Sequence, residues 1–143
     1  MLFSETTLRR VFETTTAATV GRVDDLIVDP HGPAIAALRL DGARNGEFLH
    51  WPDITGVGPD AITVARPEVV RSAEGRAAEL LTGSYQIMGK RLLTEAGNDI
   101  GRVMDIDFDP RTGIVRELVT TGGRVDGSRL VSCGSYAAVV RND

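Results

Sequence analysis

Two stretches of the chain, "VGRVDDLIVDPHGPAIAALRLDG" (residues 20–42) and "IGRVMDIDFDPRTGIVRELVTTG" (residues 100–122), align with each other without a gap. Eight of the 23 aligned positions are identical, and several of them carry glycine, proline or aspartate, which favour turns. The identical pairs are Gly21/Gly101, Arg22/Arg102, Val23/Val103, Asp25/Asp105, Asp29/Asp109, Pro30/Pro110, Leu38/Leu118 and Gly42/Gly122. This internal repetition predicts two halves of similar fold.

Each half has the pattern of short antiparallel strands joined by tight turns. Apolar and polar residues alternate in "VMDIDFD" (103–109), and Pro110 with Gly113 suits the hairpin loop that follows. Asp109 and its counterpart Asp29 are expected to accept backbone N–H groups at the start of that loop. Short apolar stretches complete each half: "EFLHW" and "AITVA" in the first, "SRLVS" and "AAVVR" in the second. The sequence therefore predicts a mainly β protein with two small antiparallel β-barrels in tandem.

A short helical linker is expected between the barrels, in "RPEVVRSAEGRAAELLTG" (66–83). Pro67 suits the first position of a helix and Gly83 suits its end, while Gly75 weakens the middle and favours a break. The expected apolar face carries Val70, Ala73, Ala77, Leu80 and Leu81. The predicted boundaries are residues 1–66 for the first repeat, 67–83 for the linker and 84–143 for the second repeat.

The repeated pattern, an apolar residue and "GRV" followed by "DP" and a glycine-containing turn, resembles the PRC-barrel domain. That family is named for the cytoplasmic domain of the photosynthetic reaction centre H subunit, and it includes the C-terminal domain of RimM-type ribosome maturation factors. The first half departs from the pattern, because Ala17 stands where the second half has the turn glycine Gly97, so its first hairpin is expected to be longer or irregular. The resemblance implies a docking module with no catalytic residues to transfer.

Three alternating aspartates, Asp105, Asp107 and Asp109, are the most obvious candidates for a metal site. They do not fit a calcium-binding helix-loop-helix loop, which needs glycine at position 6 and a bidentate glutamate at position 12, where this chain has Pro110 and Arg116. On a strand, neighbouring carboxylates of one face start about 6.6 Å apart and the outer pair about 13 Å apart. We therefore expect neither a metal ion nor a cofactor.

An enzyme is not expected either. Cys133 is the single cysteine, and nothing in the sequence pairs it with either histidine, His31 or His50, as a catalytic base. A small-ligand or enzyme site is the second alternative, and its best cluster is "FLHWPD" (48–53), where His50, Trp51 and Asp53 could line a pocket. Trp51 at the end of the barrel core, with Pro52 ending the strand, is the simpler interpretation.

Composition limits the possible partners. The formal charge of −4 gives no overall attraction to DNA or to an anionic membrane, and no apolar run is long enough to span one. The N-terminal residues show no secretory signal, so a cytoplasmic location is expected by default. The favoured partner is another protein or a second copy in a homodimer. An RNA- or ribosome-associated factor is the alternative, supported by the family resemblance and by the pairs Arg9/Arg10 and Lys90/Arg91.

The repeat also predicts which surface makes contacts. Leu26 and Val28 align with apolar residues of the second half and are expected inside, which places Ile27 on the outer face where the second half has Asp107. The next strand of the first half lacks the charges of its counterpart, so this outer face needs a cover. The expected covers are the linker helix, the other barrel or a second chain. The predicted interaction residues are Ile27, Ile35, Ala37 and Trp51.

Overall fold

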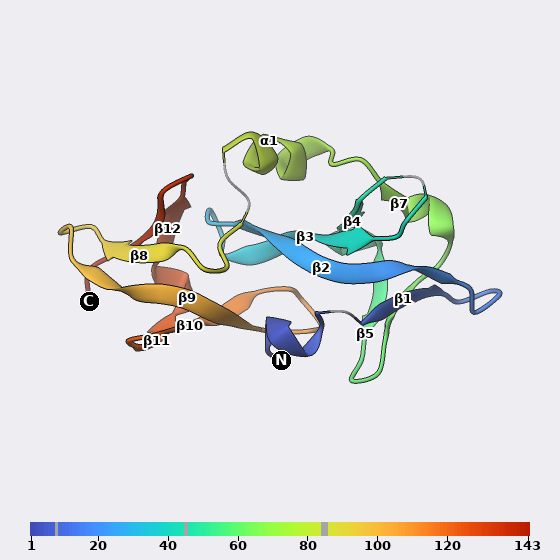
Figure 1. Cartoon of the computed structure of the whole chain (residues 1–143), viewed down its shortest axis with the longest axis horizontal. Helices are drawn as coiled ribbons and strands as arrows, with labels where there is room; N and C mark the ends of the chain where they lie inside the picture. Colours follow the sequence, from blue (N-terminus) through green and yellow to red (C-terminus); the bar gives the residue numbers. More distant parts are fainter. Residues whose placement is uncertain (8, 45, 84–85) are drawn as a thin grey trace.

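The computed structural model describes every residue except 8, 45, 84 and 85, and it shows a mainly β protein with two sheets and one short α-helix between them along the chain (Figure 1). The predicted fold class is therefore confirmed. The first sheet contains β1 (Arg10–Glu13), β2 (Thr19–Asp29), β3 (Ala34–Asp41), β4 (Phe48–His50), β5 (Ile54–Val57), β6 (Ile62–Val64) and β7 (Val70–Arg71). The second sheet contains β8 (Arg91–Thr94), β9 (Asp99–Phe108), β10 (Val115–Thr120), β11 (Gly123–Asp126), β12 (Leu130–Cys133) and β13 (Ala137–Val140).

The two halves have the same strand order. Six strands run in the order β5-β6-β1-β2-β3-β4 in the first repeat and β12-β13-β8-β9-β10-β11 in the second. The first sheet has one more strand, β7, which pairs with β4. One pair in each repeat, β1 with β6 and β8 with β13, is parallel, although the sequence predicted antiparallel pairing. The reason lies in the 3-10 turns η2 (Trp51–Asp53) and η4 (Gly127–Arg129), after which β5 and β12 keep the direction of the preceding strand.

The repeats meet at equivalent hairpin tips. Ala34 forms an antiparallel bridge with its own counterpart, Ile114. The Ile35 N–H donates to the Gly113 carbonyl at 2.8 Å, and the equivalent Val115 N–H donates to the Pro33 carbonyl at 2.9 Å. This reciprocal exchange is the contact pattern of a two-fold dimer, formed here within one chain.

One hydrophobic core runs through both repeats. Leu26 and Val28 of β2 and the aligned Ile106 and Phe108 of β9 are all buried in it, which confirms the predicted inner face of these strands. The two curled sheets are thus parts of one packed body.

The segment between the repeats is broken more than the sequence predicted. A 3-10 turn, η3 (Pro67–Val69), leads into strand β7, where Val70 pairs with Leu49 of β4 and so does not lie on the helix. The α-helix α1 runs from Gly75 to Gly83, and Gly75 has φ +57°, a left-handed conformation that glycine tolerates at the helix start. Among the described residues, no helix is long and apolar enough to cross a membrane. The domain boundaries remain a prediction.

The first hairpin differs between the repeats as expected. Its loop is one residue longer in the first repeat, where the Glu13 N–H reaches the Ala18 carbonyl, than in the second, where the Thr94 N–H reaches the Asn98 carbonyl. Ala17 has φ 60° and Gly97 has φ 85°, so alanine occupies a conformation that favours glycine.

Candidate functional site

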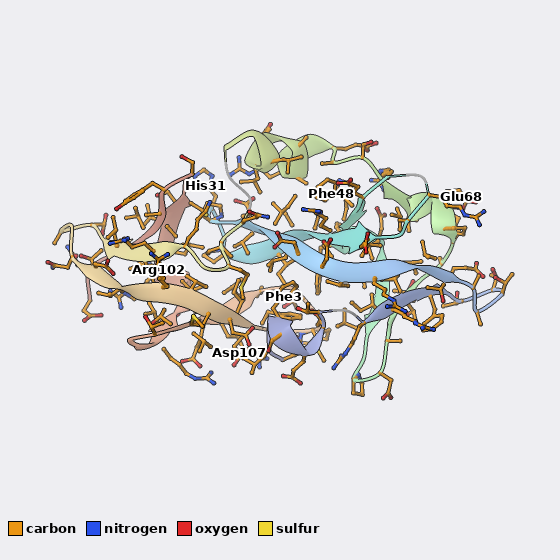
Figure 2. The ribbon with its side chains drawn as sticks, in the orientation of Figure 1. Phe3, His31, Phe48, Glu68, Arg102 and Asp107 are labelled. Atoms are coloured by element: carbon orange, nitrogen blue, oxygen red, sulfur yellow. The ribbon has the colours of Figure 1, made fainter. Side chains whose placement is uncertain are left out.

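The outer face of the first repeat is apolar and lies under helix α1. Ile27 and Ala37 face each other across β2 and β3, and both are fully buried. With Phe48 of β4 and Ala77 of α1 they form a second, small hydrophobic cluster, separate from the main core. Figure 2 shows Phe48 on the side of the first sheet that faces α1. The sequence allowed three covers for this face: the linker helix, the other barrel or a second chain. The structure shows that the linker helix α1 covers it.

Helix α1 depends on this packing. At nine residues it is shorter than helices that are stable alone in water. Ala73 precedes the helix, and Leu80 and Leu81 lie near its end; all three are partly buried against the cluster around Ala77. Ala77, the buried helix residue of this cluster, has a small side chain, so polar contacts at the start of the helix also help to hold it in place.

One polar contact joins α1 to the hairpin between β2 and β3. Arg76 makes two hydrogen bonds to the Asp29 carboxylate, at 3.0 and 3.1 Å, and lies 2.9 Å from Nδ1 of His31. The hydrogen bond from Arg76 holds the pKa of Asp29 below its ordinary value. Asp29 also accepts the His31 N–H at 2.9 Å, which is the turn contact predicted from the sequence.

A second polar contact joins the start of α1 to β4. Nε2 of His50 accepts the backbone N–H of Glu74 at 3.0 Å, so in the neutral ring the proton lies on Nδ1. Nδ1 is buried and has no hydrogen-bond partner among the described residues. Burial, and then the positive charge of Arg71, lower the pKa of His50 below its ordinary value. His50 is thus a neutral, buried acceptor for the helix.

A cleft of about 610 Å³ opens beside this contact, between the first turn of α1 and the hairpin tips. Its walls include His50, Trp51 and Asp53, the residues that the sequence marked as a possible pocket. Arg71 crosses one side and pairs with Asp53 at 2.7 Å and with Glu74 at 3.1 Å. Each of these carboxylates is therefore paired within the protein, although the two together exceed the single positive charge of Arg71 by one.

Trp51 connects the two repeats. Its ring packs edge-on against Phe108 of β9, with ring centroids 6.0 Å apart and an interplanar angle of 85°. A Cβ atom at Gly113 would lie 2.7 Å from Cε2 of Trp51, so the glycine also makes room for the indole. Trp51 thus forms part of the junction between the repeats. Its place at the end of the stretch "FLHW" (48–51) did not reveal this contact with the second repeat.

Ile35 lies on a different face from the one predicted. The sequence grouped it with Ile27 and Ala37, because residues two apart on a strand share a face. In the structure β3 has a bulge: Ile27 pairs with Ala37, but Val28 pairs with Ile35, which leaves Ala36 as the extra residue. Ile35 consequently enters the core shared by both repeats. No feature of the sequence "AIAAL" marks this bulge.

The outer face of the second repeat carries charges at the same positions. In register with Ile27, Ala37 and Phe48, the second repeat has Asp107, Glu117 and Arg124. Arg124 lies 3.5 Å from the Asp107 carboxylate and 2.9 Å from that of Glu117. In place of a helix, the N-terminal residues cover this strand: the α-amino nitrogen of Met1 lies 3.1 Å from Asp107.

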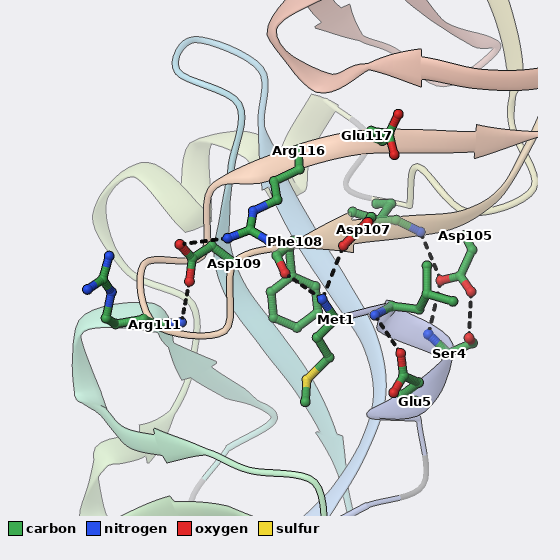
Figure 3. Close-up of polar contacts among 12 residues, drawn as sticks. Met1, Ser4, Glu5, Asp105, Asp107, Phe108, Asp109, Arg111, Arg116 and Glu117 are labelled. Atoms are coloured by element: carbon green, nitrogen blue, oxygen red, sulfur yellow. Dashed lines mark hydrogen bonds and ion pairs between the residues drawn. The ribbon is translucent and has the colours of Figure 1, made fainter.

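The three alternating aspartates point to three different sets of partners, which Figure 3 shows. Asp105 accepts from the backbone N–H and hydroxyl of Ser4, while Asp107 pairs with Met1. Asp109 accepts the Arg111 N–H at 2.8 Å, in the predicted turn contact, and pairs with Arg116 at 3.3 Å. Among the described residues, no group of three or more His, Cys, Asp or Glu side chains is placed to hold a metal ion.

Cys133 lies at the end of β12, half-buried, with Nζ of Lys90 4.0 Å from its sulfur. Burial raises the pKa of its thiol above the ordinary value. A raised pKa keeps the thiol protonated at neutral pH, which is the opposite of what a nucleophilic cysteine needs.

With this geometry described, comparison with known families identifies one part of the chain. Residues 83–142, which include β8–β13, match the family model of the PRC-barrel domain. No curated protein matches the chain. The first repeat lies outside the matched segment but has the same strand order.

Proposed function

We propose, from the premise that residues 83–142 are a PRC-barrel domain, that this protein is a non-catalytic module that binds another protein or a second copy of itself. The family generally serves in binding or scaffolding. The observation that carries the proposal is the duplication: a second unit of the same topology is fused to the PRC-barrel domain through one shared core. Two barrel-like repeats joined through one core present two outer faces, which suits a scaffold.

The two outer faces offer different chemistry to partners. The face of the second repeat is charged, through Asp107, Glu117 and Arg124. The face of the first repeat is apolar, but α1 covers Ile27 and Ala37, so a partner reaches these residues only when α1 moves aside. We propose Ile27 and Ala37 as contact residues in that open state, whereas Ile35 and Trp51 support the junction between the repeats.

Affinity capture from the native cell tests the proposal. The bait is the tagged full chain, and the control bait carries Leu118→Asp, which places a charge in the core and removes the fold. We expect a protein, either another species or untagged copies of this chain, to be enriched on the intact bait only and to persist after nuclease treatment. Equal recovery on both baits would contradict the proposal. Loss of all enrichment after nuclease treatment would favour an RNA-associated role instead.

A further inference from the structure

We propose that His50 is a proton-sensitive catch for helix α1, which releases the helix and exposes the apolar outer face of the first repeat when the imidazole is protonated. The consequence for binding rests on the proposed function, because the exposed face would serve as a contact surface. The catch itself is a property of the chain and is tested without a partner.

The catch works through one acceptor atom. Nε2 of His50 accepts the Glu74 N–H at 3.0 Å, directly before the first residue of α1. Protonation turns Nε2 into a donor, so two N–H groups would then point at each other and the hydrogen bond is lost. His50 is only 8% exposed, so the charged ring cannot turn to water without moving its cover.

The buried Nδ1 atom adds to the free-energy cost of protonating His50 in the closed state. It is buried without a hydrogen-bond partner in the described part of the chain, so nothing is in place to stabilise a positive ring at that nitrogen. A ligand in the neighbouring cleft does not reach this atom either, because it is covered. The closed state of α1 therefore requires the neutral imidazole.

Charged groups from three elements surround the ring. Arg71 of β7 opposes protonation, whereas Asp53 of η2 and Glu74 before α1 favour it. Both carboxylates are already paired with the Arg71 guanidinium, at 2.7 and 3.1 Å, which weakens their pull on His50. On α1 itself, Arg76 pairs with Asp29. The depressed pKa of His50 agrees with this arrangement, its largest cause being burial.

The direction of the pH effect follows from that sign. A histidine whose pKa is lower in the closed state binds its proton preferentially in the open state. The closed state is therefore most strongly favoured above about pH 6.5, the ordinary pKa of a histidine side chain. Its population falls as the pH drops below that value. Release exposes Ile27, Ala37 and Phe48, which are buried while α1 is in place.

Hydrogen exchange of the α1 amides, corrected for intrinsic rates, measures the opening of the helix. Between about pH 8 and pH 5 we expect protection in α1 to fall about tenfold, because protonation of His50 favours the open state, while the amides of β9 keep their protection. In His50→Gln, whose amide oxygen replaces Nε2 as acceptor but does not titrate, protection should not change with pH.

His31→Gln is the matched control, because His31 also contacts α1, through Arg76, but is exposed. This variant should keep the pH response of the wild type. A response that persists in His50→Gln, disappears in His31→Gln, or extends equally to β9 would overturn the proposal, as would the absence of any response in the wild type.

The ring itself gives a second measurement that needs no variant. Long-range proton–nitrogen NMR spectra of the wild-type chain should show the Nδ1–H tautomer of His50 near pH 8 and a midpoint of its protonation below the ordinary histidine value of 6.5. An Nε2–H tautomer, or a His50 midpoint above that value, would contradict the proposal. Neither result bears on whether the protein binds a partner, so failure here is distinct from failure in the capture experiment.

Discussion

The outer faces of the two repeats have the same backbone and opposite chemistry. Paired positions on β2, β3 and β4 carry Ile27, Ala37 and Phe48, whereas those on β9, β10 and β11 carry Asp107, Glu117 and Arg124. The apolar face is covered by α1, and the charged face is partly covered by residues 1–5, on opposite sides of the molecule (Figure 1). The hydrogen-bond ladder therefore sets the fold of each repeat, whereas the outward-facing side chains determine which segment covers it.

Exchanging the apolar and charged side chains of the two outer faces should have the largest effect on stability. Ile27→Asp places an unpaired carboxylate beneath α1, where Ile27 is fully buried, and should lower the free energy of unfolding by roughly 3–5 kcal/mol. Urea denaturation measures the change. The reciprocal Asp107→Ile removes partly exposed ion pairs and should cost about 1 kcal/mol or less. Equal losses in the two variants would show that α1 is no cover.

The junction between the repeats gives the next largest effect. Trp51→Ala removes the edge-on contact with Phe108 and should cost about 2–3 kcal/mol. Gly113→Ala should cost about 2 kcal/mol, because φ is +79° and the new Cβ would meet the indole. The double variant should lose about 1 kcal/mol less stability than the sum of the two single losses, because without the indole the new Cβ of residue 113 no longer clashes with it. Strict additivity in denaturation experiments would mean that Trp51 does not press on Gly113.

Replacing the equivalent turn aspartates, Asp29 and Asp109, should have smaller effects on stability. Asp29→Asn keeps the turn acceptor but weakens the pair with Arg76, and should cost about 0.5–1 kcal/mol and reduce amide protection in α1. Because Arg76 lowers the pKa of Asp29, this contribution is present above pH 3.8, its ordinary value, and is lost as the pH falls through the lower folded-state value.

Asp109→Asn is the control for that variant. Asp109 pairs with Arg116 on its own hairpin and does not touch α1, so its replacement should leave the protection of α1 unchanged. The same loss of α1 protection in both variants would contradict the assignment of Asp29 as a helix contact.

The smallest expected effect is none at all. Adding calcium or magnesium, or a chelator, should leave the thermal unfolding midpoint unchanged, because Asp105, Asp107 and Asp109 are occupied by Ser4, Met1 and Arg116. Differential scanning calorimetry measures this, with Asp107→Asn as a comparison. A midpoint that rises with either cation in the wild type but not in the variant would establish a metal site.

Particular residues show how far local pattern carries. Asp29 and Asp109 were predicted as turn acceptors and are found so, because an aspartate side chain reaches the N–H two residues onward whatever surrounds it. The strand β11 could not be predicted from local pattern, because "GGRVDG" (122–127) has too few apolar residues to signal a strand. His50 and Trp51 were named as neighbours in sequence, but the contacts that define them, with Glu74 and Phe108, are tertiary.

The duplication, the hairpins, the inner face of β2 and β9, and the need for a cover over Ile27 can all be predicted from the amino-acid sequence. They follow from alternation and turn chemistry, which act over a few residues. The sequence does not reveal that α1 is that cover, that the bulge at Ala36 sends Ile35 into the shared core, or that equivalent hairpin tips bond to each other. Each of these depends on contacts between residues far apart in the chain, which form only when the whole protein is packed.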